Sequence, residues 1–168
     1  MANDQGHLER VLDMKKGDIF EGYVESVTFP NKGYVTVEDR RAAVKGVIAG
    51  QKVRVRMKRL RRENCQATLL EVVERSPLEN ATPYCPHFGA CGGCSYQTMS
   101  YENQIQVKQG IVKSLLDPYL MKNGITMDEP LKSPLPFGYR NKMEFSFGDE
   151  VKGGPLCLGM HKKNSTYD

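Results

Sequence analysis

Three cysteines lie within ten residues of this chain, and their thiols are the side chains best suited to chemistry. Five residues separate Cys85 from Cys91, two separate Cys91 from Cys94, and Gly92 and Gly93 fill the shorter gap. Thiolates are good ligands for zinc and for iron–sulfur clusters. Glycines let the backbone turn tightly around a metal centre, including conformations with positive φ. The stretch therefore predicts a metal-binding loop.

The kind of metal centre stays open on spacing alone. Zinc sites usually combine two cysteine pairs of this spacing, or cysteines with histidines, and here one such pair is accompanied by His87. An iron–sulfur cluster requires three close cysteines and a distant fourth. Free thiols are the least favoured reading, and His87 is expected to lie outside the ligand set. Cys65, far from this loop, is expected to pack as a small apolar residue.

Composition narrows the class of protein. The 168 residues carry a net charge of +4 and five cysteines. No apolar run is long enough to cross a bilayer, and residues 1–7 lack the features of a signal peptide. We therefore predict a cytoplasmic protein with no membrane partner, in which cysteines serve metal binding rather than disulfides.

The elements that must position this loop begin with a β-rich segment. We expect residues 1–13 to be a flexible leader and residues 14–74 to form a small barrel. Short β-type runs alternate there with glycine-bearing turns, which is typical of a five-stranded OB-like barrel. The expected strands are residues 19–27, 34–37, 43–47, 52–58 and 65–73. The fold class is mainly β, with an α+β second part.

A basic stripe accompanies the fourth expected strand. Residues 40–62 contain ten basic residues and no acidic one. Strict alternation places apolar residues on one face of residues 52–58 and basic residues on the other. Such a one-sided face is suited to phosphate contacts, and OB-type barrels favour single-stranded or looped targets, so RNA is expected rather than DNA. The predicted RNA-binding residues are Lys52, Arg54, Arg56, Lys58, Arg59, Arg61 and Arg62.

The second half predicts a linker, a helix and a hairpin. Residues 75–84 form a proline-bearing linker, and residues 85–130 hold the cysteine loop and a helix capped by Ser100. An apolar stripe on that helix is expected to face a core, and Asp117-Pro118 is expected to end it near Leu116. Residues 131–168 predict the start of a further α+β domain, as a β-hairpin that pairs residues 143–147 with residues 156–161.

Taken together, these features resemble the RumA-type 23S rRNA uracil-5-methyltransferases. The cysteine segment, residues 85–94, carries most of the resemblance, and the weaker matches extend over nearly the whole chain after the leader. They comprise residues 30–33, the basic strand from Lys52, residues 101–104, Lys108, residues 139–142 and residues 158–161.

The resemblance implies a TRAM domain at residues 14–74 and a [4Fe-4S] cluster held by Cys85, Cys91 and Cys94. It implies that the fourth ligand lies beyond residue 168, since Cys157 does not match the family position. In the family, S-adenosylmethionine and the catalytic residues belong to a C-terminal domain, so no catalytic residue is expected in this stretch. The implied partner is 23S ribosomal RNA, and the expected role is RNA recognition without catalysis.

Two other functions compete with this one. A stand-alone RNA-binding TRAM module with a zinc-stapled extension would need no methyltransferase domain. A radical enzyme of the tRNA methylthiolation type also carries TRAM, but at the other end of its chain and with a different cysteine spacing. The metal content discriminates between a cluster and a zinc staple.

Overall fold

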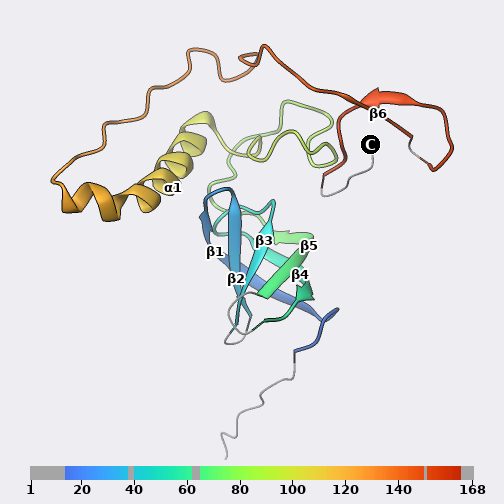
Figure 1. Ribbon diagram of the computed structural model, residues 1–168, viewed down its shortest axis with the longest axis horizontal. Helices are drawn as coiled ribbons and strands as arrows, with labels where there is room; N and C mark the ends of the chain where they lie inside the picture. Colours follow the sequence, from blue (N-terminus) through green and yellow to red (C-terminus); the bar gives the residue numbers. More distant parts are fainter. Residues whose placement is uncertain (1–13, 38–39, 62–64, 150, 164–168) are drawn as a thin grey trace, which may run out of the picture.

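The barrel, the cysteine loop, one long helix and a terminal hairpin follow one another along the chain in a computed structural model (Figure 1). The structure describes residues 14–37, 40–61, 65–149 and 151–163. The expected leader, residues 1–13, and Arg62 of the basic stripe lie outside the described residues. No helix in the described ranges is long and apolar enough to cross a membrane.

The predicted five-stranded barrel is confirmed, and it closes in the order β1-β2-β3-β5-β4. Neighbouring strands are antiparallel except β3 and β5, which run parallel. Each strand lies within a few residues of its expected position. The strands are β1 (Ile19–Thr28), β2 (Lys32–Val37), β3 (Arg40–Lys45), β4 (Lys52–Arg59) and β5 (Cys65–Glu74).

Alternation along the strands fills the barrel with small branched side chains. On β4, Val53, Val55 and Met57 are almost completely buried, whereas the basic residues between them point outward. Cys65 at the start of β5 is 4% exposed in the same core, which confirms its predicted packing. The remaining buried core consists of Met14, Val24, Val35, Val37, Ala42, Val44, Val47 and Ala67.

Two glycines let the strands approach closely. A Cβ atom on Gly22 would lie 2.7 Å from Cγ1 of Val35, and one on Gly33 would lie 2.2 Å from Cγ2 of Val47. Carbon atoms at optimal packing are separated by about 3.5–4.0 Å. Both positions are therefore restricted to glycine by space inside the barrel.

The segment predicted as a linker is anchored to the barrel. The hydroxyl of Ser76 donates to the carbonyl of Ala49 (2.7 Å), and the side-chain oxygen of Glu79 accepts from the backbone N–H of Ser76 (2.8 Å). The same carboxylate accepts from the amide of Gln51 (2.9 Å), whose own oxygen accepts from Ile48 N–H (2.8 Å). Because these groups are largely shielded from water, the network holds the start of the second part in a fixed position.

Helix α1 (Tyr101–Lys122) begins as predicted and ends later. The hydroxyl of Ser100 accepts the N–H of Asn103 (3.3 Å), which confirms the N-cap. The predicted stop at Pro118 is wrong, since the helix runs on to Lys122 and ends where the Asn123 amide donates to the Tyr119 carbonyl (2.7 Å). A proline in the last turns removes one hydrogen bond, and the capping at Asn123 follows five residues later.

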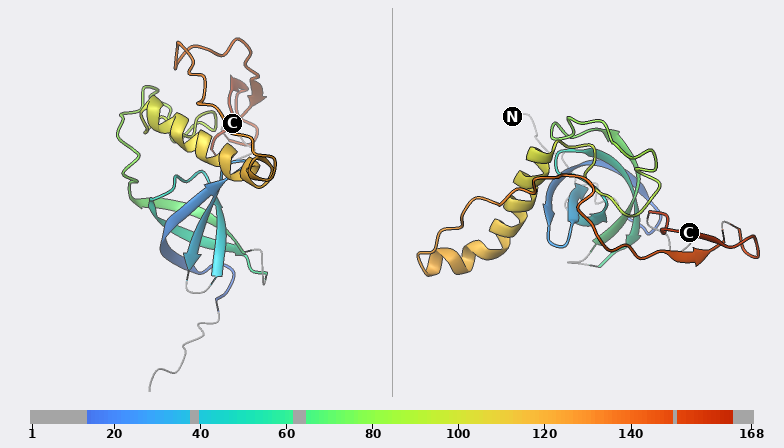
Figure 2. Two further views of the ribbon diagram at one scale, coloured as in Figure 1. Left: turned by 90° about the vertical axis from the view of Figure 1, so that its left-hand side faces the viewer. Right: turned by 90° about the horizontal axis from the view of Figure 1, so that it is seen from above.

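The apolar stripe on α1 is only partly covered by the described residues, since Tyr101 and Ile105 are half-buried and the later members are exposed. No described residue of the helix is buried, and Leu115 is 53% exposed. The predicted core position of this stripe is therefore not confirmed. Figure 2 shows α1 extending away from the barrel, with an irregular segment leading from its end to the hairpin.

The terminal hairpin is confirmed in a shorter form. β6 (Ser146–Gly148) pairs with β7 (Cys157–Gly159), with Phe147 opposite Leu158. Residues 143–145, expected to extend the first strand, are not in a β-strand. Phe145 and Phe147 are exposed, so the hairpin presents apolar side chains to solvent within the described ranges.

Candidate nucleic-acid interface and cysteine loop

The polar face of β4 is divided into two halves with different electrostatic surroundings. The strand lies between β1 and β5, and its register places Arg54 beside Glu21 of β1 and Glu71 of β5. Toward the other end, Arg56 has the uncharged residues Ile19 and Thr68 as its neighbours. Along the chain, residues 40–62 carry charges of one sign only. On the barrel surface, however, the neighbouring strands add carboxylates to one half of this basic face.

Arg54 is held by two carboxylates. Its guanidinium lies 2.7 Å from Oε1 of Glu21 and 2.6 Å from Oε2 of Glu71. The hydrogen bond that Arg54 donates to Glu21, with the charges of both carboxylates, raises the pKa of Arg54. Its positive charge is thus matched within the barrel, although its predicted contact with RNA stays a prediction.

Lys52 is paired in the same way. Its Nζ atom lies 3.2 Å from Oε1 of Glu74, and the hydroxyl of Tyr23 donates to the other oxygen of that carboxylate (3.2 Å). The hydrogen bond and charge of Glu74 raise the pKa of Lys52. Alternation in β1 is a signal that could have identified Glu21, because it directs Glu21 to the outer face beside β4. Alternation in β5 could not have identified both Glu71 and Glu74, which are three residues apart, and irregularities in the β4–β5 register bring both of them beside β4.

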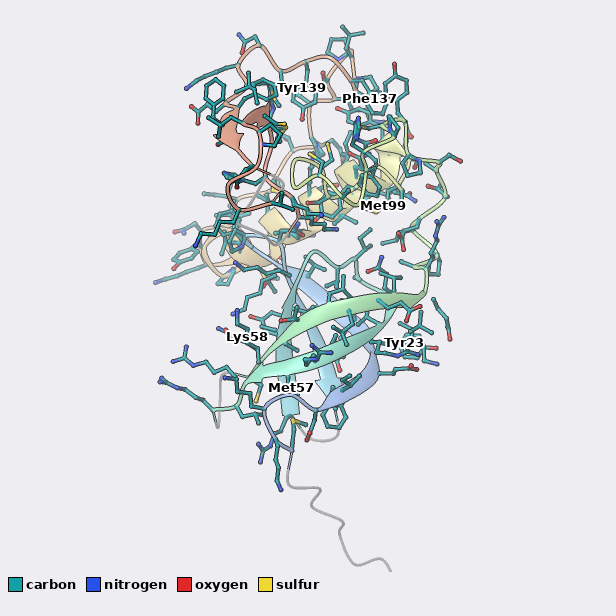
Figure 3. All side chains as sticks on the ribbon, turned by 90° about the vertical axis from the view of Figure 1, so that its right-hand side faces the viewer. Tyr23, Met57, Lys58, Met99, Phe137 and Tyr139 are labelled. Atoms are coloured by element: carbon teal, nitrogen blue, oxygen red, sulfur yellow. The ribbon has the colours of Figure 1, made fainter. Side chains whose placement is uncertain are left out.

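The basic residues at the far end of β4 remain available. Arg56, Lys58, Arg59 and Arg61 are exposed, and within the described ranges none of them forms an ion pair with a carboxylate. Figure 3 shows Lys58 and Tyr23 on opposite sides of the β4–β5 face. In Figure 1 this end of β4 lies beside the start of β1, opposite to the cysteine loop. We call Arg56, Lys58, Arg59 and Arg61 the open basic end.

The cysteine loop places its thiols near the surface. Cys85 and Cys91 are partly buried and Cys94 is exposed, and all three are free. The backbone N–H of Cys85 donates to the Gln97 side chain (3.0 Å), and the N–H of Gly93 donates to Sγ of Cys91 (3.3 Å). No group of three His, Cys, Asp or Glu side chains among the described residues is arranged to hold a metal ion.

The types of side chain in the loop suit a metal centre, but their positions do not yet form one. Three thiols on one glycine-bearing loop are the donor set that an iron–sulfur cluster or a zinc ion uses. The N–H donated to Sγ of Cys91 is a contact of the kind that tunes cluster sulfurs. The thiols are not gathered, however, and the loop would have to tighten on binding. We therefore assign no geometry to the bound group.

The C-terminal segment is bonded to the cysteine loop. The N–H of Gly92 donates to the His161 carbonyl (3.0 Å), and the N–H of Lys163 donates to the Ala90 carbonyl (2.7 Å). A Cβ atom on Gly92 would lie 3.0 Å from the His161 carbonyl oxygen, so a side chain there would crowd this backbone contact. Cys157 lies on β7 and is exposed, outside the loop.

Tyr96 joins the cysteine region to the barrel. Its hydroxyl donates to Oδ1 of Asn31, in the turn between β1 and β2. Partial burial raises the pKa of the Tyr96 phenol above the usual value of about 10. A raised folded-state pKa contributes stability at lower pH that is lost as the pH rises through that pKa.

We expect Tyr96→Phe to lower the free energy of unfolding at neutral pH by about 0.5–1.5 kcal/mol, through the lost hydrogen bond. Above about pH 10 the difference should shrink, because phenylalanine has no proton to lose. Urea titrations at neutral and alkaline pH measure this. An equal difference at both pH values would contradict a titrating role for Tyr96. Some alkaline loss should remain in the variant, since the pKa of Lys52 is raised as well.

Comparison with known proteins confirms the resemblance. The chain is 43% identical over 158 residues to an uncharacterized RNA methyltransferase of Caldanaerobacter subterraneus, covering 92% of this chain and 34% of the relative. It is 42% identical to an uncharacterized RNA methyltransferase of Clostridium acetobutylicum, and the match covers 92% of this chain and 33% of that relative. It is 31% identical to the 23S rRNA (uracil(1939)-C(5))-methyltransferase RlmD of Alkalilimnicola ehrlichii, and the match covers 88% of this chain and 33% of that relative.

The matched region is an N-terminal part of these relatives. The chain spans about a third of their length. No family model matches the chain.

Proposed function

We propose that this chain is the RNA-recognition and iron–sulfur portion of an S-adenosylmethionine-dependent 23S rRNA uracil-5-methyltransferase, which forms 5-methyluridine. The observation that carries the proposal is the open basic end on an OB-like barrel, in a chain whose relatives are named RNA methyltransferases. Because the proposed substrate is ribosomal RNA, we also propose that the protein is located in the cytoplasm.

The barrel would hold RNA through phosphates. Arg56, Lys58, Arg59 and Arg61 carry charges that no described carboxylate pairs, so contact with phosphate would release counterions without breaking an ion pair. Lys52 and Arg54 would have to exchange glutamate partners for phosphates, and their net contribution is expected to be smaller. Arg62 belongs to the proposed surface by sequence alone, since it lies outside the described residues.

Cys85, Cys91 and Cys94 would hold a [4Fe-4S] cluster, with the fourth ligand beyond residue 168. The loop sits between the barrel and the C-terminal segment, through Tyr96 and His161 respectively. A bound cluster would fix these parts relative to one another. We propose a structural role, because methyl transfer requires no electrons. Catalytic residues and S-adenosylmethionine binding are assigned outside these 168 residues, and the chain alone should bind RNA without methylating it.

The test compares two double variants of equal charge change on the same strand. Arg56→Gln/Lys58→Gln removes two open charges, and Lys52→Gln/Arg54→Gln removes two paired ones. Affinity for a fluorescent single-stranded RNA is measured by anisotropy over a range of salt concentrations. The first variant should bind more weakly, with a salt slope lower by about 0.7 per lost contact. The second variant should change less.

Two results would count against the proposal. Absence of salt-dependent RNA binding by the unchanged chain would remove the RNA-recognition function. Affinity and salt slope that stay the same in Arg56→Gln/Lys58→Gln would remove the open basic end as the contact surface. Methyl transfer by the chain alone, with S-adenosylmethionine added, would contradict the assignment of catalysis to another part.

A further inference from the structure

Tyr34 and Arg41 form a stacked pair on the outer face of β2 and β3. The guanidinium carbon of Arg41 lies 4.0 Å from the centre of the Tyr34 ring. Its Nη2 atom donates to the hydroxyl of Ser26 on β1 (2.9 Å). The side chain thus starts on β3, crosses the ring on β2 and ends on β1, so that its planar group is held over the aromatic ring.

The strand register explains this arrangement. Ser26 lies opposite Tyr34 in the β1–β2 pair, and Arg41 lies opposite Thr36 in the β2–β3 pair. Arg41 is therefore diagonal to Tyr34, within reach of a long side chain folding back across the sheet. Tyr34 is half-buried beneath it, whereas Arg41 is exposed. The guanidinium carbon lies over the tyrosine ring, and the Arg41 side chain is exposed to solvent.

The surroundings of the pair are basic. Nζ of Lys32 lies 5.5 Å from the Tyr34 ring centre, and Lys45 is opposite Lys32 in register. Within the described ranges, Lys32, Arg41 and Lys45 form no ion pair with a carboxylate. Glu38 and Asp39, which follow β2 in the sequence, lie outside those ranges. Lys32 and Lys45 supply positive charge beside the ring, of the kind that attracts phosphate.

The pair is also continuous with the open basic end. β3 and β5 are parallel, with Ala42 opposite Cys65 and Ala43 opposite Gln66. Gln66 is in turn opposite Arg59 on β4. The start of β3, with Arg40 and Arg41, and the end of β4 therefore share one end of the barrel, separated by the uncharged start of β5. A strand that contacts phosphates along β4 can pass round this end to Tyr34.

We propose that Tyr34 and Arg41 form a stacking site for an unpaired base of RNA. The inference rests on the proposed RNA-recognition function and adds a contact to a base, where the open basic end contacts phosphates. Unpaired bases stack on aromatic rings and on guanidinium planes, and the Arg41 plane is already fixed by Tyr34 and Ser26. A duplex, whose bases are stacked on one another, cannot use the site.

The experiment measures binding of the 168-residue chain to a mixed-sequence single-stranded RNA and to a duplex of the same length. Tyr34→Ala removes the ring, Arg41→Lys keeps the charge but removes the plane, and Tyr34→Phe is the matched control that retains the ring. Both Tyr34→Ala and Arg41→Lys should weaken single-strand binding by about fivefold or more. Duplex affinity and the salt slope should stay the same, because no charge is lost. Tyr34→Phe should bind like the unchanged chain.

Arg41→Lys protects the test against misfolding, since an exposed charge-conserving change leaves the core intact. Single-strand affinities of Tyr34→Ala and Arg41→Lys equal to that of the unchanged chain would overturn the inference. Equal losses for single strand and duplex would overturn it as well, because they indicate a phosphate contact or a general disturbance. If Arg56→Gln/Lys58→Gln still weakens binding in that case, the proposed function stands and this inference alone fails. If the unchanged chain does not bind RNA, both the proposed RNA-recognition function and the base-stacking inference are wrong.

Discussion

Replacing any one of Cys85, Cys91 and Cys94 by serine is expected to abolish most of the iron and acid-labile sulfide that the chain takes up under anaerobic reconstitution. A serine hydroxyl is a poor ligand for iron in a cluster, which is held by thiolates. With three proposed ligands in one loop, the loss of one leaves too few thiolates to hold the group. The measurement is iron, zinc and sulfide content per chain after removal of unbound metal.

Cys157→Ser and Cys65→Ser are the controls. Cys157 is exposed on β7 and Cys65 is buried in the barrel core, and neither belongs to the loop. Both variants should retain the iron content of the unchanged chain. A loss in Cys157→Ser equal to that in Cys91→Ser would make Cys157 the fourth ligand and contradict its assignment beyond residue 168.

Zinc bound without sulfide would favour a different function. In that case the loop is a zinc staple, and the chain is better described as an RNA-binding module with a metal-stabilised extension. Because the thiols are not gathered among the described residues, binding of either group should also order the loop. Slower hydrogen exchange at Gly92 and Gly93 after reconstitution would report that change.

Gly33→Ala is expected to lower the free energy of unfolding by about 1–3 kcal/mol. The added methyl group would lie 2.2 Å from Cγ2 of Val47 and 3.4 Å from Cγ1 of Val24, inside a core with little free space. Val47 is 1% exposed and cannot move aside into solvent. The variant should show a lower melting temperature and a lower urea midpoint with an unchanged slope.

A double-mutant cycle identifies the cause. Val47→Ala removes the methyl group that Gly33→Ala would strike, so the double variant should be more stable than the sum of the two single effects indicates. Gly110→Ala is the matched control, because a Cβ atom there meets no atom within 4 Å. It should leave the barrel unchanged and favour α1 by up to about 1 kcal/mol. Strictly additive effects of Gly33→Ala and Val47→Ala would contradict the steric explanation.

The barrel could be predicted closely from the sequence because its signals are local. Alternation of apolar and polar residues fixes which side of a strand is buried, and glycine-bearing turns separate the strands. Cys65 was correctly predicted as a core residue for the same reason. The Ser100 cap is equally local, since a serine hydroxyl contacts an N–H three residues along the chain.

The predictions about α1 fell short for two reasons. Pro118 weakens a helix without always ending it, and the capping by Asn123 sets the end instead. The apolar stripe shows only that the helix has an apolar side, and what covers that side depends on residues distant in sequence. In the described ranges only its first part is half-buried, at Tyr101 and Ile105, so the sequence pattern alone could not place the whole stripe in a core.

The barrel, the position of the cysteine loop and the supply of basic residues can all be predicted from the sequence. How those charges are shared between strands depends on the way the strands pair in the folded barrel. Glu21 and Glu71 are distant from Arg54 in the chain, yet pairing of β1 and β5 with β4 brings both to its guanidinium. Pairing of β2 with β3 brings Arg41 over Tyr34, and pairing of β5 with both β3 and β4 brings the start of β3 near the end of β4. Electrostatic pairing depends on distance in space, and strand register sets that distance.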